Sequence, residues 1–458
     1  MKKNQPNTAW ERLTDKEIND AYNFCNGYKH FLNIAKTERE ATEYIVNEAL
    51  SAGFKRIEEM NSIEAGQKIL VEQKGKVAAL IVVGEEPIYN GLNIIASHTD
   101  SPRLDLKPRP MYEDDGLAFF KTHYYGGIKK YHWLAIPLAL HGVVIKKDGS
   151  CIKINIGESE EDITFTIADL LPHLAKDQME KKMSEAISGE GLNALIGTRY
   201  NKDNGDKSIK AYLKEILKSE YNIEEDDFTS AELQLVPALK AKDLGFDRSM
   251  VAGYGQDDRV SAYCSLKAIL ETDKPPKTAM CLFVDKEEIG SMGNTGLQSL
   301  LIENITAELL HLDGNDSYHV LRNTLMKSYA LSADVNAAVD PNYPEVFEKM
   351  NNSSLSKGVV LTKYTGSRGK SVSNDANPEY VAKIRNLFDS NNIEWQVGEL
   401  GKVDIGGGGT VAQYIAYYGI EVVDCGVAIL GMHSPFEIAS KADIYMSYKA
   451  YKAFFKDL

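Results

Sequence analysis

Residues 92–100 have the sequence LNIIASHTD, a short apolar run that ends on a histidine and an aspartate. A run of this length is typical of a buried β-strand. Comparable apolar runs lie at 78–83, 279–284, 329–333, 359–361 and 420–430. Segments with helical spacing of apolar residues separate them, notably 377–391 and 438–455. Strands that alternate with helices predict an α/β fold whose sheet is covered by helices on its faces.

The first 53 residues are predicted to be helical. Thr37 and Glu40 form a capping-box pattern at a helix start. The apolar positions that follow at helical spacing are Ala41, Ile45, Ala49 and Leu50. Gly53 ends this pattern.

The middle of the chain has a different pattern of apolar and polar residues. Residues 143–156 alternate between apolar and polar around Asp148-Gly149, which predicts a β-hairpin. Residues 174–228 are polar and rich in charge, with a weak helical pattern at 209–217. We therefore expect two domains: an α/β domain formed by 1–106 and 232–458, and a β-rich module inserted at 107–231.

The composition excludes several classes of function. The 458 residues include 66 acidic and 52 basic ones, for a formal charge of −14, so no basic excess exists to neutralise nucleic-acid phosphates. The five cysteines are isolated, which excludes thiolate metal pairs and suits a reducing cytoplasm. The N-terminus lacks the apolar run of a signal peptide, and no stretch is apolar for the roughly 18 residues that a membrane span needs. We expect a cytoplasmic protein with no membrane or nucleic-acid partner.

Side chains of the kind that bind metals follow four of the apolar runs. They are His98 and Asp100, then Asp285, Glu287 and Glu288, then Asp334, and finally His433. Asp257 and Asp258 open a predicted helix. In open α/β sheets, ligand sites lie beyond the carboxyl ends of the strands. Two histidines and several carboxylates at such an edge would provide nitrogen and oxygen ligands for zinc, cobalt or manganese.

Each of these pieces also has an ordinary structural explanation. A histidine and an aspartate two residues apart can bond within a loop, paired glutamates are usually solvated, and Asp257-Asp258 can cap a helix. The metal site is nevertheless favoured, because all the pieces coincide at ends of predicted elements. Adjacent carboxylates also raise each other's pKa unless a cation lies between them.

The chain resembles the M18 family of co-catalytic metalloaminopeptidases, the aspartyl aminopeptidase group. The resemblance rests on HTDSP at 98–102, QDDR at 256–259, DKEEIGS at 285–291, SAD at 332–334 and GMHS at 431–434. It implies a metallopeptidase domain with a central mixed sheet covered by helices, interrupted by a β-rich dimerisation domain. It also implies homo-oligomers in which dimers assemble further, for example into dodecamers.

By position, the resemblance implies two divalent metal ions per subunit, with zinc favoured and cobalt or manganese as alternatives. Asp257 matches the carboxylate that bridges both ions. His98 and Asp334 would complete one ion's ligands, and Glu288 and His433 the other's. Glu287 matches the general base and Asp100 the acid that orients His98.

The implied reaction is aminopeptidase hydrolysis, in which a hydroxide that bridges the ions attacks the first peptide bond. Consecutive side chains at a strand end diverge, so Glu287 is expected not to share a metal with Glu288. His173, in PHLA at 172–175, resembles a histidine that reaches the neighbouring subunit's site. A purely structural histidine is the alternative.

Five residues are candidates for substrate binding: Lys363, Arg368, Lys370, Gly407 and Gly408. The three cations could bind an acidic N-terminal side chain, but the sequence departs from the family at 366–370, so a preference for Asp or Glu stays open. The glycine run 406–409 lacks the GK[ST] ending of a phosphate-binding loop. We expect it to form a wall of the substrate cleft, with a flexible turn as the alternative.

Two other functions are compatible with these residues. The same metal centre could serve a deacylase or a carboxypeptidase. Alternatively, the chain could be a catalytically silent assembly protein on this fold. A silent scaffold needs no general base, so the presence of Glu287 beside a full set of candidate ligands favours the enzyme.

Overall fold

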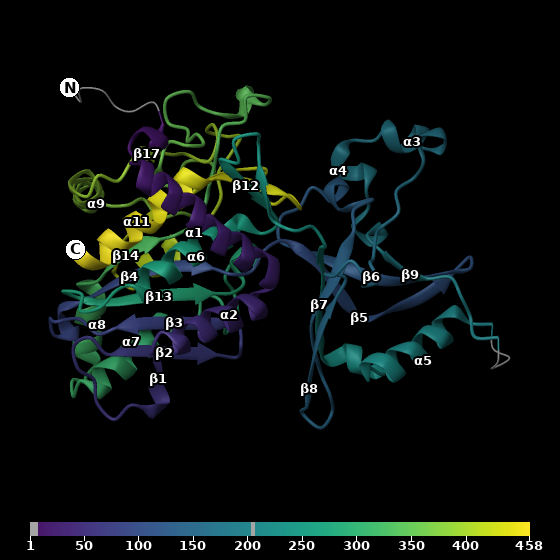
Figure 1. Cartoon of the computed structure of the whole chain (residues 1–458), viewed down its shortest axis with the longest axis horizontal. Coiled ribbons are helices and arrows are strands. Elements are labelled where there is room, and N and C mark those ends of the chain that lie inside the picture. The colour runs from purple at the N-terminus through teal and green to yellow at the C-terminus, as the bar shows by residue number, and fades with distance from the viewer. Residues whose placement is uncertain (1–7, 203–206) are drawn as a thin grey trace. The chain divides into compact units, whose positions relative to one another are not determined.

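The structure, a computed structural model, describes residues 8–202 and 207–458. The chain divides into two compact units, each with its own strands and helices (Figure 1). The first unit comprises the chain up to Asp100 together with Ala241–Met432 and Phe436–Leu458. The second comprises Ser101–Lys240 and the short segment His433–Pro435. The range 107–231, expected for the inserted module, lies inside the second unit.

A nine-stranded sheet forms the centre of the first unit. In order across the sheet, its strands are β1 (Lys55–Arg56), β2 (Lys68–Gln73), β3 (Val77–Val82), β13 (Thr278–Val284), β4 (Leu92–His98), β14 (Tyr329–Ser332), β18 (Glu421–Gly426), β16 (Val359–Thr362) and β17 (Trp395–Val397). The four strands from β13 to β18 are parallel to one another. β3 and β16 pair antiparallel with them on either side. The predicted α/β fold is confirmed, and the sheet is mixed.

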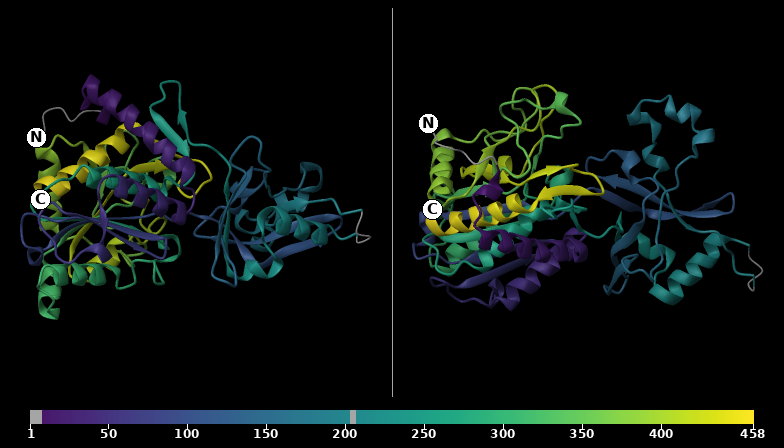
Figure 2. Two further views of the ribbon diagram at one scale, coloured as in Figure 1. Left: turned by 60° about the horizontal axis from the view of Figure 1, so that its bottom comes forward. Right: turned by 45° about the horizontal axis from the view of Figure 1, so that its top comes forward.

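Helices bury both faces of this sheet. Successive strand residues point to opposite faces, and Ile95 and Ile94 accordingly belong to two different cores. The helices around Ile95 are α1 (Asp15–Ile34), α2 (Glu38–Ser51), α6 (Gln256–Leu270), α9 (Pro378–Ser390) and α11 (Lys441–Asp457). Those around Ile94 are α7 (Leu301–Leu312), α8 (Tyr318–Met326) and α10 (Ala412–Ala416). In the left view of Figure 2, the yellow C-terminal helix and a green helix lie on opposite sides of the sheet.

The N-terminal helical segment forms two helices, α1 and α2. The predicted capping box at Thr37 is confirmed, with the Glu40 N–H donating to the Thr37 hydroxyl at 3.3 Å. A second capping box, at Thr14 and Glu17, begins α1. Leu50 is 43% exposed and so does not belong to the buried face of α2.

A five-stranded sheet in the same unit corrects two predictions. Its strands, in order, are β11 (Lys242–Leu244), β12 (Met250–Gly253), β20 (Glu437–Ser440), β19 (Ala428–Leu430) and β15 (Asn336–Ala337). The apolar run 420–430 is therefore not one strand, because β18 and β19 belong to different sheets. They separate after Gly426, where any side chain would collide with the backbone of Asp334. Residues 438–440, predicted as helix, instead pair as a strand before α11 begins.

The second unit is built on a six-stranded antiparallel sheet. Its strands, in order, are β8 (Cys151–Ile156), β7 (Leu138–Ile145), β10 (Ala231–Pro237), β5 (Arg103–Asp114), β6 (Leu117–Tyr125) and β9 (Ala194–Gly197). The predicted hairpin is confirmed as β7 and β8. The predicted helix at 209–217 is α5 (Ile209–Tyr221), and two short helices, α3 (Lys176–Met179) and α4 (Met183–Ala186), precede it. Within the described ranges, no helix combines the length and apolarity required to cross a membrane.

Candidate metal centre

Three neighbouring parallel strands bring the first site residues together. β13, β4 and β14 are adjacent, and their carboxyl ends lie at one edge of the large sheet. His98 is the last residue of β4, Asp334 follows β14, and the two glutamates follow β13. The apolar run that precedes His433 does not end at this edge, because its last strand, β19, belongs to the five-stranded sheet.

His98 lies at the centre of a cluster of carboxylates. Its imidazole is 1% exposed, and Nε2 lies 3.2 Å from Asp257 Oδ1, 3.8 Å from Glu287 Oε2 and 3.9 Å from Asp334 Oδ1. One possible ligand atom from each of His98, Asp257 and Asp334 lies within 4.8 Å of the others. The same is true of His98, Glu287 and Glu288. Two sets of potential metal ligands therefore overlap at His98.

Asp100 connects His98 with the turn that carries the glutamates. Its Oδ1 lies 3.3 Å from His98 Nδ1, the nitrogen that faces away from the cluster. Its two oxygens also accept hydrogen bonds from the backbone N–H groups of Glu287 and Glu288, each at 3.2 Å. This side chain is fully buried. The sequence predicted the contact of Asp100 with His98. The hydrogen bonds of Asp100 to the turn that carries Glu287 and Glu288 were not predicted.

Glu287 and Glu288 do not lie at a strand end. They begin a short 3₁₀ turn, Glu287–Ile289, entered through Lys286 at a positive φ of 68°. A 3₁₀ turn lacks the two-residue alternation of a strand. The prediction that the two carboxylates diverge is therefore wrong, because both can reach within 4.8 Å of each other and of His98.

Burial and charge shift the protonation of the cluster. Burial lowers the pKa of His98. Hydrogen bonds to Asp100 and Asp257 and the charge of Glu287 raise it, and their combined effect is larger, so the pKa lies well above its usual range. Burial and the charge of Glu287 raise the pKa of Asp334 well above its usual range. The acids thus favour positive charge at His98, and a divalent cation can supply this charge in place of a proton.

Asp257 and Asp258 open α6 as predicted, but they have different surroundings. The peptide bond between them is cis. Asp257 faces His98, whereas the buried Asp258 accepts a hydrogen bond from the backbone N–H of His98 at 3.4 Å. Burial raises the pKa of Asp258 well above its usual range. Asp258 therefore contacts the strand end that carries His98.

One buried acid beside the site was not predicted from the sequence. Glu437, the first residue of β20, accepts hydrogen bonds from the backbone N–H groups of Gln256 and Asp257. The available signal was a charged residue between the apolar residues Phe436 and Ile438. Without the pairing of β20 with β12, that signal does not indicate what Glu437 contacts.

The two remaining histidine candidates belong to the second unit. His433 lies in the segment His433–Pro435, and its Nδ1 is 2.7 Å from the carbonyl oxygen of Gly127. His173 lies in a 3₁₀ turn, Pro172–Leu174, and is exposed.

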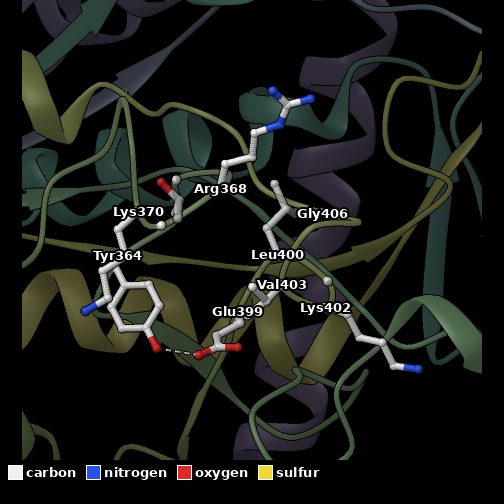
Figure 3. Close-up of a pocket in the computed structure, with 12 residues that line it drawn as sticks. Tyr364, Arg368, Lys370, Glu399, Leu400, Lys402, Val403 and Gly406 are labelled. Atoms are coloured by element: carbon white, nitrogen blue, oxygen red, sulfur yellow. Dashed lines mark hydrogen bonds between the residues drawn. The ribbon is translucent and has the colours of Figure 1, made fainter.

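The candidate substrate cations are partly neutralised. Lys363 and Lys370 both form ion pairs with Asp375, the second at 2.9 Å. Arg368 and Lys370 line a cavity of about 250 Å³, in which the Tyr364 hydroxyl donates to Glu399 at 2.6 Å (Figure 3).

The candidate glycines pack against the chain itself. A side chain at Gly407, where φ is 120°, would meet the Ser367 backbone at 2.6 Å. The N–H of Gly408 donates to the carbonyl oxygen of Thr365 at 3.2 Å. The close backbone approach that requires a glycine at position 407 is therefore an intramolecular one.

The donors around His98 are chemically suited to a divalent metal. One imidazole and several carboxylates offer the nitrogen and oxygen ligands that zinc accepts, at separations that a single ion can span. The same donors also suit manganese or cobalt. The residues present therefore fit a metal centre.

Comparisons with known proteins agree with this chemistry. Residues 31–455 match the family described as aminopeptidase I zinc metalloprotease (M18). The chain is 49% identical over 451 residues to a probable M18 family aminopeptidase 1 of Clostridium acetobutylicum, covering 97% of each chain. A crystal structure of an M18 family aminopeptidase from Thermotoga maritima matches with a TM-score of 0.96 at 43% identity, covering 100% of both chains. The dodecamer of mApe1 from S. cerevisiae matches with a TM-score of 0.75 at 20% identity over 95% of this chain and 96% of that one, a likeness of fold alone.

Proposed function

This chain belongs to the M18 family of zinc aminopeptidases, which are peptide hydrolases, and on that premise we propose that it removes N-terminal residues from peptides with two divalent metal ions per subunit. The observation that carries the proposal is the position of Asp257: one of its possible ligand atoms lies within 4.8 Å of those of His98 and Asp334, and one also lies within 4.8 Å of that of Glu288. Zinc is the favoured metal, and cobalt and manganese are alternatives.

We assign Asp257 as the carboxylate shared by both ions. His98 and Asp334 would complete the ligands of one ion, and their proximity to Asp257 supports this assignment. Glu288 and His433 would complete those of the other, with His433 assigned from its motif. When bound, such ions would lower the pKa of a water molecule and stabilise negative charge on the peptide carbonyl oxygen.

Glu287 is the proposed general base. It would take a proton from the attacking water and pass it to the leaving amine. Its side chain is 18% exposed, and its Oε2 lies 3.8 Å from His98 Nε2, so it can reach a group bound beside the histidine while remaining open to substrate. Asp100 would orient His98 and hold the turn on which Glu287 lies.

The substrate would need a free α-amine, which the acidic cluster can attract. An acidic N-terminal side chain would have to compete with Asp375 for Lys363 and Lys370. We therefore propose that the enzyme is not restricted to Asp and Glu at the N-terminus. Arg368, Gly407 and Gly408 stay candidates for contacts with the remainder of the peptide.

We further propose that the second unit mediates homo-oligomerisation and that His173 acts in the neighbouring subunit's site. The exposed apolar side chains of Leu170, Leu171 and Leu174 flank His173, and such clusters favour a protein interface. Dimers that assemble into dodecamers are the expected form; the mApe1 structure with a similar fold is a dodecamer. A cytoplasmic location is also proposed, because all five cysteines are free and four of them are buried.

The decisive variant for the proposed function is Glu287→Gln. It should abolish peptide hydrolysis while metal content stays near two ions per subunit, because the amide cannot accept the proton. Asp313→Asn, a change in a helix-end carboxylate outside the cluster, is the control and should keep full activity. Turnover retained by Glu287→Gln would refute its assignment as the base.

Acetylation of the substrate's α-amine separates the aminopeptidase from the alternative enzymes. The proposed enzyme should not cleave the blocked peptide. A deacylase or carboxypeptidase would act on it, and a silent assembly protein would cleave neither form even when loaded with zinc, cobalt or manganese.

A further inference from the structure

Glu437 is a buried carboxylate held by two backbone N–H groups. It is 1% exposed, and its Oε2 accepts from Gln256 N at 2.5 Å and from Asp257 N at 3.3 Å. A carboxylate is costly to bury without hydrogen bonds, and bonds to an ionised acceptor are stronger than neutral ones. These contacts therefore tie Glu437 to the backbone of Asp257.

The Gln256 side chain adds a second connection between the same two segments. Its Nε2 donates to the backbone carbonyl of Glu437 at 2.6 Å and to that of Val251 at 3.2 Å. Its Oε1 accepts the hydroxyl hydrogen of Tyr28 at 3.2 Å. Gln256 and Tyr28 are both fully buried. The residue before Asp257 is thus held through both its backbone and its side chain.

Arg259 binds the backbone just before Gln256, at Tyr254 and Gly255. Its guanidinium is fully buried and donates to the carbonyl oxygens of Gly255 at 2.9 Å, Tyr254 at 3.1 Å and Ala35. It also lies over the Tyr254 ring, 5.0 Å from the centroid. A buried acid and a buried base therefore constrain the short segment that leads into Asp257.

We propose that Glu437 is a positioning residue that sets the place of Asp257 and thereby the affinity of the site for metal. The inference rests on the proposed role of Asp257 as a metal ligand. Asp257 Oδ1 lies 3.2 Å from His98 Nε2, and no strand of the large sheet carries Asp257 to that point. The bonds from Glu437 fix the backbone from which the carboxylate extends. Partners that orient metal ligands in this way typically change metal affinity by about 10- to 100-fold when they are altered.

The test compares Glu437→Gln with Asp443→Asn in metal-free, full-length protein. Asp443 is a matched control, because it is also a buried acid that accepts two backbone N–H groups, those of Ser356 at 2.6 Å and Gly358 at 2.7 Å. Both changes replace a buried acid with an amide of similar shape. At Glu437, where one oxygen accepts both N–H groups, the amide removes the charge that strengthens these bonds. The measurements are the Co²⁺ dissociation constant, the visible absorption spectrum of bound Co²⁺ and the thermal unfolding temperature without metal.

Glu437→Gln should weaken Co²⁺ binding by about 10- to 100-fold and alter its absorption spectrum. Asp443→Asn should leave both metal readouts unchanged. If Glu437→Gln binds Co²⁺ like the wild type, with an unaltered spectrum, the positioning role is refuted. If Glu437→Gln does not fold, Glu437→Asp, which keeps the charge but shortens the side chain, is measured in the same way and decides by the same criteria.

Asp257→Asn distinguishes this inference from the proposed function. If Asp257→Asn binds Co²⁺ like the wild type, the assignment of Asp257 as a ligand fails, and the inference fails with it. If Asp257→Asn loses Co²⁺ while Glu437→Gln keeps wild-type affinity, only the positioning role is overturned.

Discussion

The carboxylate of Asp100 accepts a hydrogen bond from the backbone N–H of Glu287, with 3.2 Å between Oδ1 and N. The same oxygen lies 3.3 Å from Nδ1 of His98. One buried acid therefore links a candidate metal ligand, at the end of β4, with the candidate general base, in the turn that follows β13. A change at Asp100 should affect both metal binding and turnover.

Asp100→Asn should weaken zinc binding by about 10- to 100-fold and lower kcat. An amide has one acceptor oxygen, so it cannot accept from both Glu287 and Glu288, and its NH₂ group would face a donor. Calorimetric titration of the metal-free protein with Zn²⁺ measures the first effect. Asp340→Asn, in a surface turn that bonds Asn342, should change neither quantity. Wild-type zinc affinity in Asp100→Asn would contradict the proposed link.

Asp375→Asn should shift substrate preference toward acidic N-termini. The change releases Lys363 and Lys370 from their shared counter-ion. Exposed ion pairs are worth about 0.2–1 kcal/mol, so the kcat/KM ratio of Asp- to Leu-peptides should rise about 1.4- to fivefold. Lys363→Met combined with Asp375→Asn should cancel part of the rise. An unchanged ratio would place these lysines outside substrate recognition.

Asp443 should make stability depend on pH. Burial raises its pKa to about 8, against the opposing effects of its bonds to Gly358 and Ser356 and the charge of Lys357. Because the folded pKa exceeds the unfolded value of about 3.9, its contribution is present at low pH and is lost as pH rises toward 8. Between pH 5 and 8, the metal-free wild type should lose more thermal stability than Asp443→Asn. Parallel losses in the two proteins would contradict the raised pKa.

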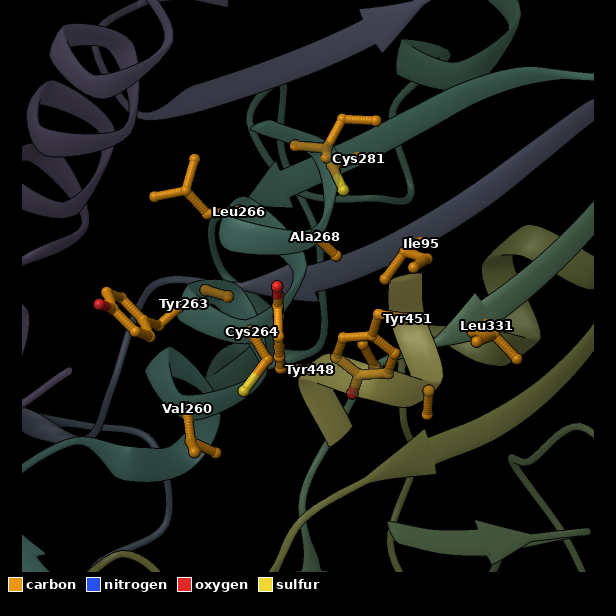
Figure 4. Close-up of a cluster of buried hydrophobic side chains, with 14 of the residues drawn as sticks. Ile95, Val260, Tyr263, Cys264, Leu266, Ala268, Cys281, Leu331, Tyr448 and Tyr451 are labelled. Atoms are coloured by element: carbon orange, nitrogen blue, oxygen red, sulfur yellow. The ribbon is translucent and has the colours of Figure 1, made fainter. Parts of the chain in front are cut away.

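Leu331→Ala should destabilise the first unit by about 2–5 kcal/mol. Leu331 is fully buried in the core that also contains Ile95 and Tyr451 (Figure 4), and truncation leaves a cavity there. Denaturant unfolding of the metal-free protein measures the change. Tyr417→Ala, at a position that is 87% exposed, should change stability by less than about 0.5 kcal/mol. Equal effects of the two variants would contradict the described packing.

Subunit mixing tests whether His173 acts between subunits. Glu287→Gln and His173→Ala should each be inactive alone. In a mixed dimer, the site that keeps Glu287 would receive His173 from the other chain, so co-expression should restore about a quarter of the wild-type activity under random pairing. Activity of His173→Ala alone, or no recovery on mixing, would contradict the role of His173.

The fold was largely predictable because its strands are locally encoded. The strands β3, β4 and β13 are buried at every position and mostly apolar, and strands covered on both faces require such runs. The prediction of one strand at 420–430 was wrong because the composition of this run does not show that β18 and β19 join different sheets. That division depends on the close approach of Gly426 to the backbone of Asp334, far away in the sequence.

The site was predictable in its residue types but not in its geometry. Metal-type side chains directly after strands converge because the carboxyl ends of parallel strands share an edge. The Glu287-Glu288 pair was misjudged, since a 3₁₀ turn replaces the strand alternation from which divergence was argued. Glu437 was missed because its significance depends entirely on which backbone groups it meets.

By itself, the sequence determined the α/β class, the family and the side chains available for metal chemistry, because these depend on local periodicity and on motifs within short segments. Only the tertiary structure decided that Asp100 holds the turn of Glu287, that Glu437 holds the backbone of Asp257, and that Asp375 pairs with Lys363 and Lys370. Glu437 meets Asp257 through the antiparallel pairing of β12 with β20, and Asp100 meets Glu287 through the parallel pairing of β4 with β13. Such pairings join segments that are far apart in the chain, so no pattern within either segment reveals them.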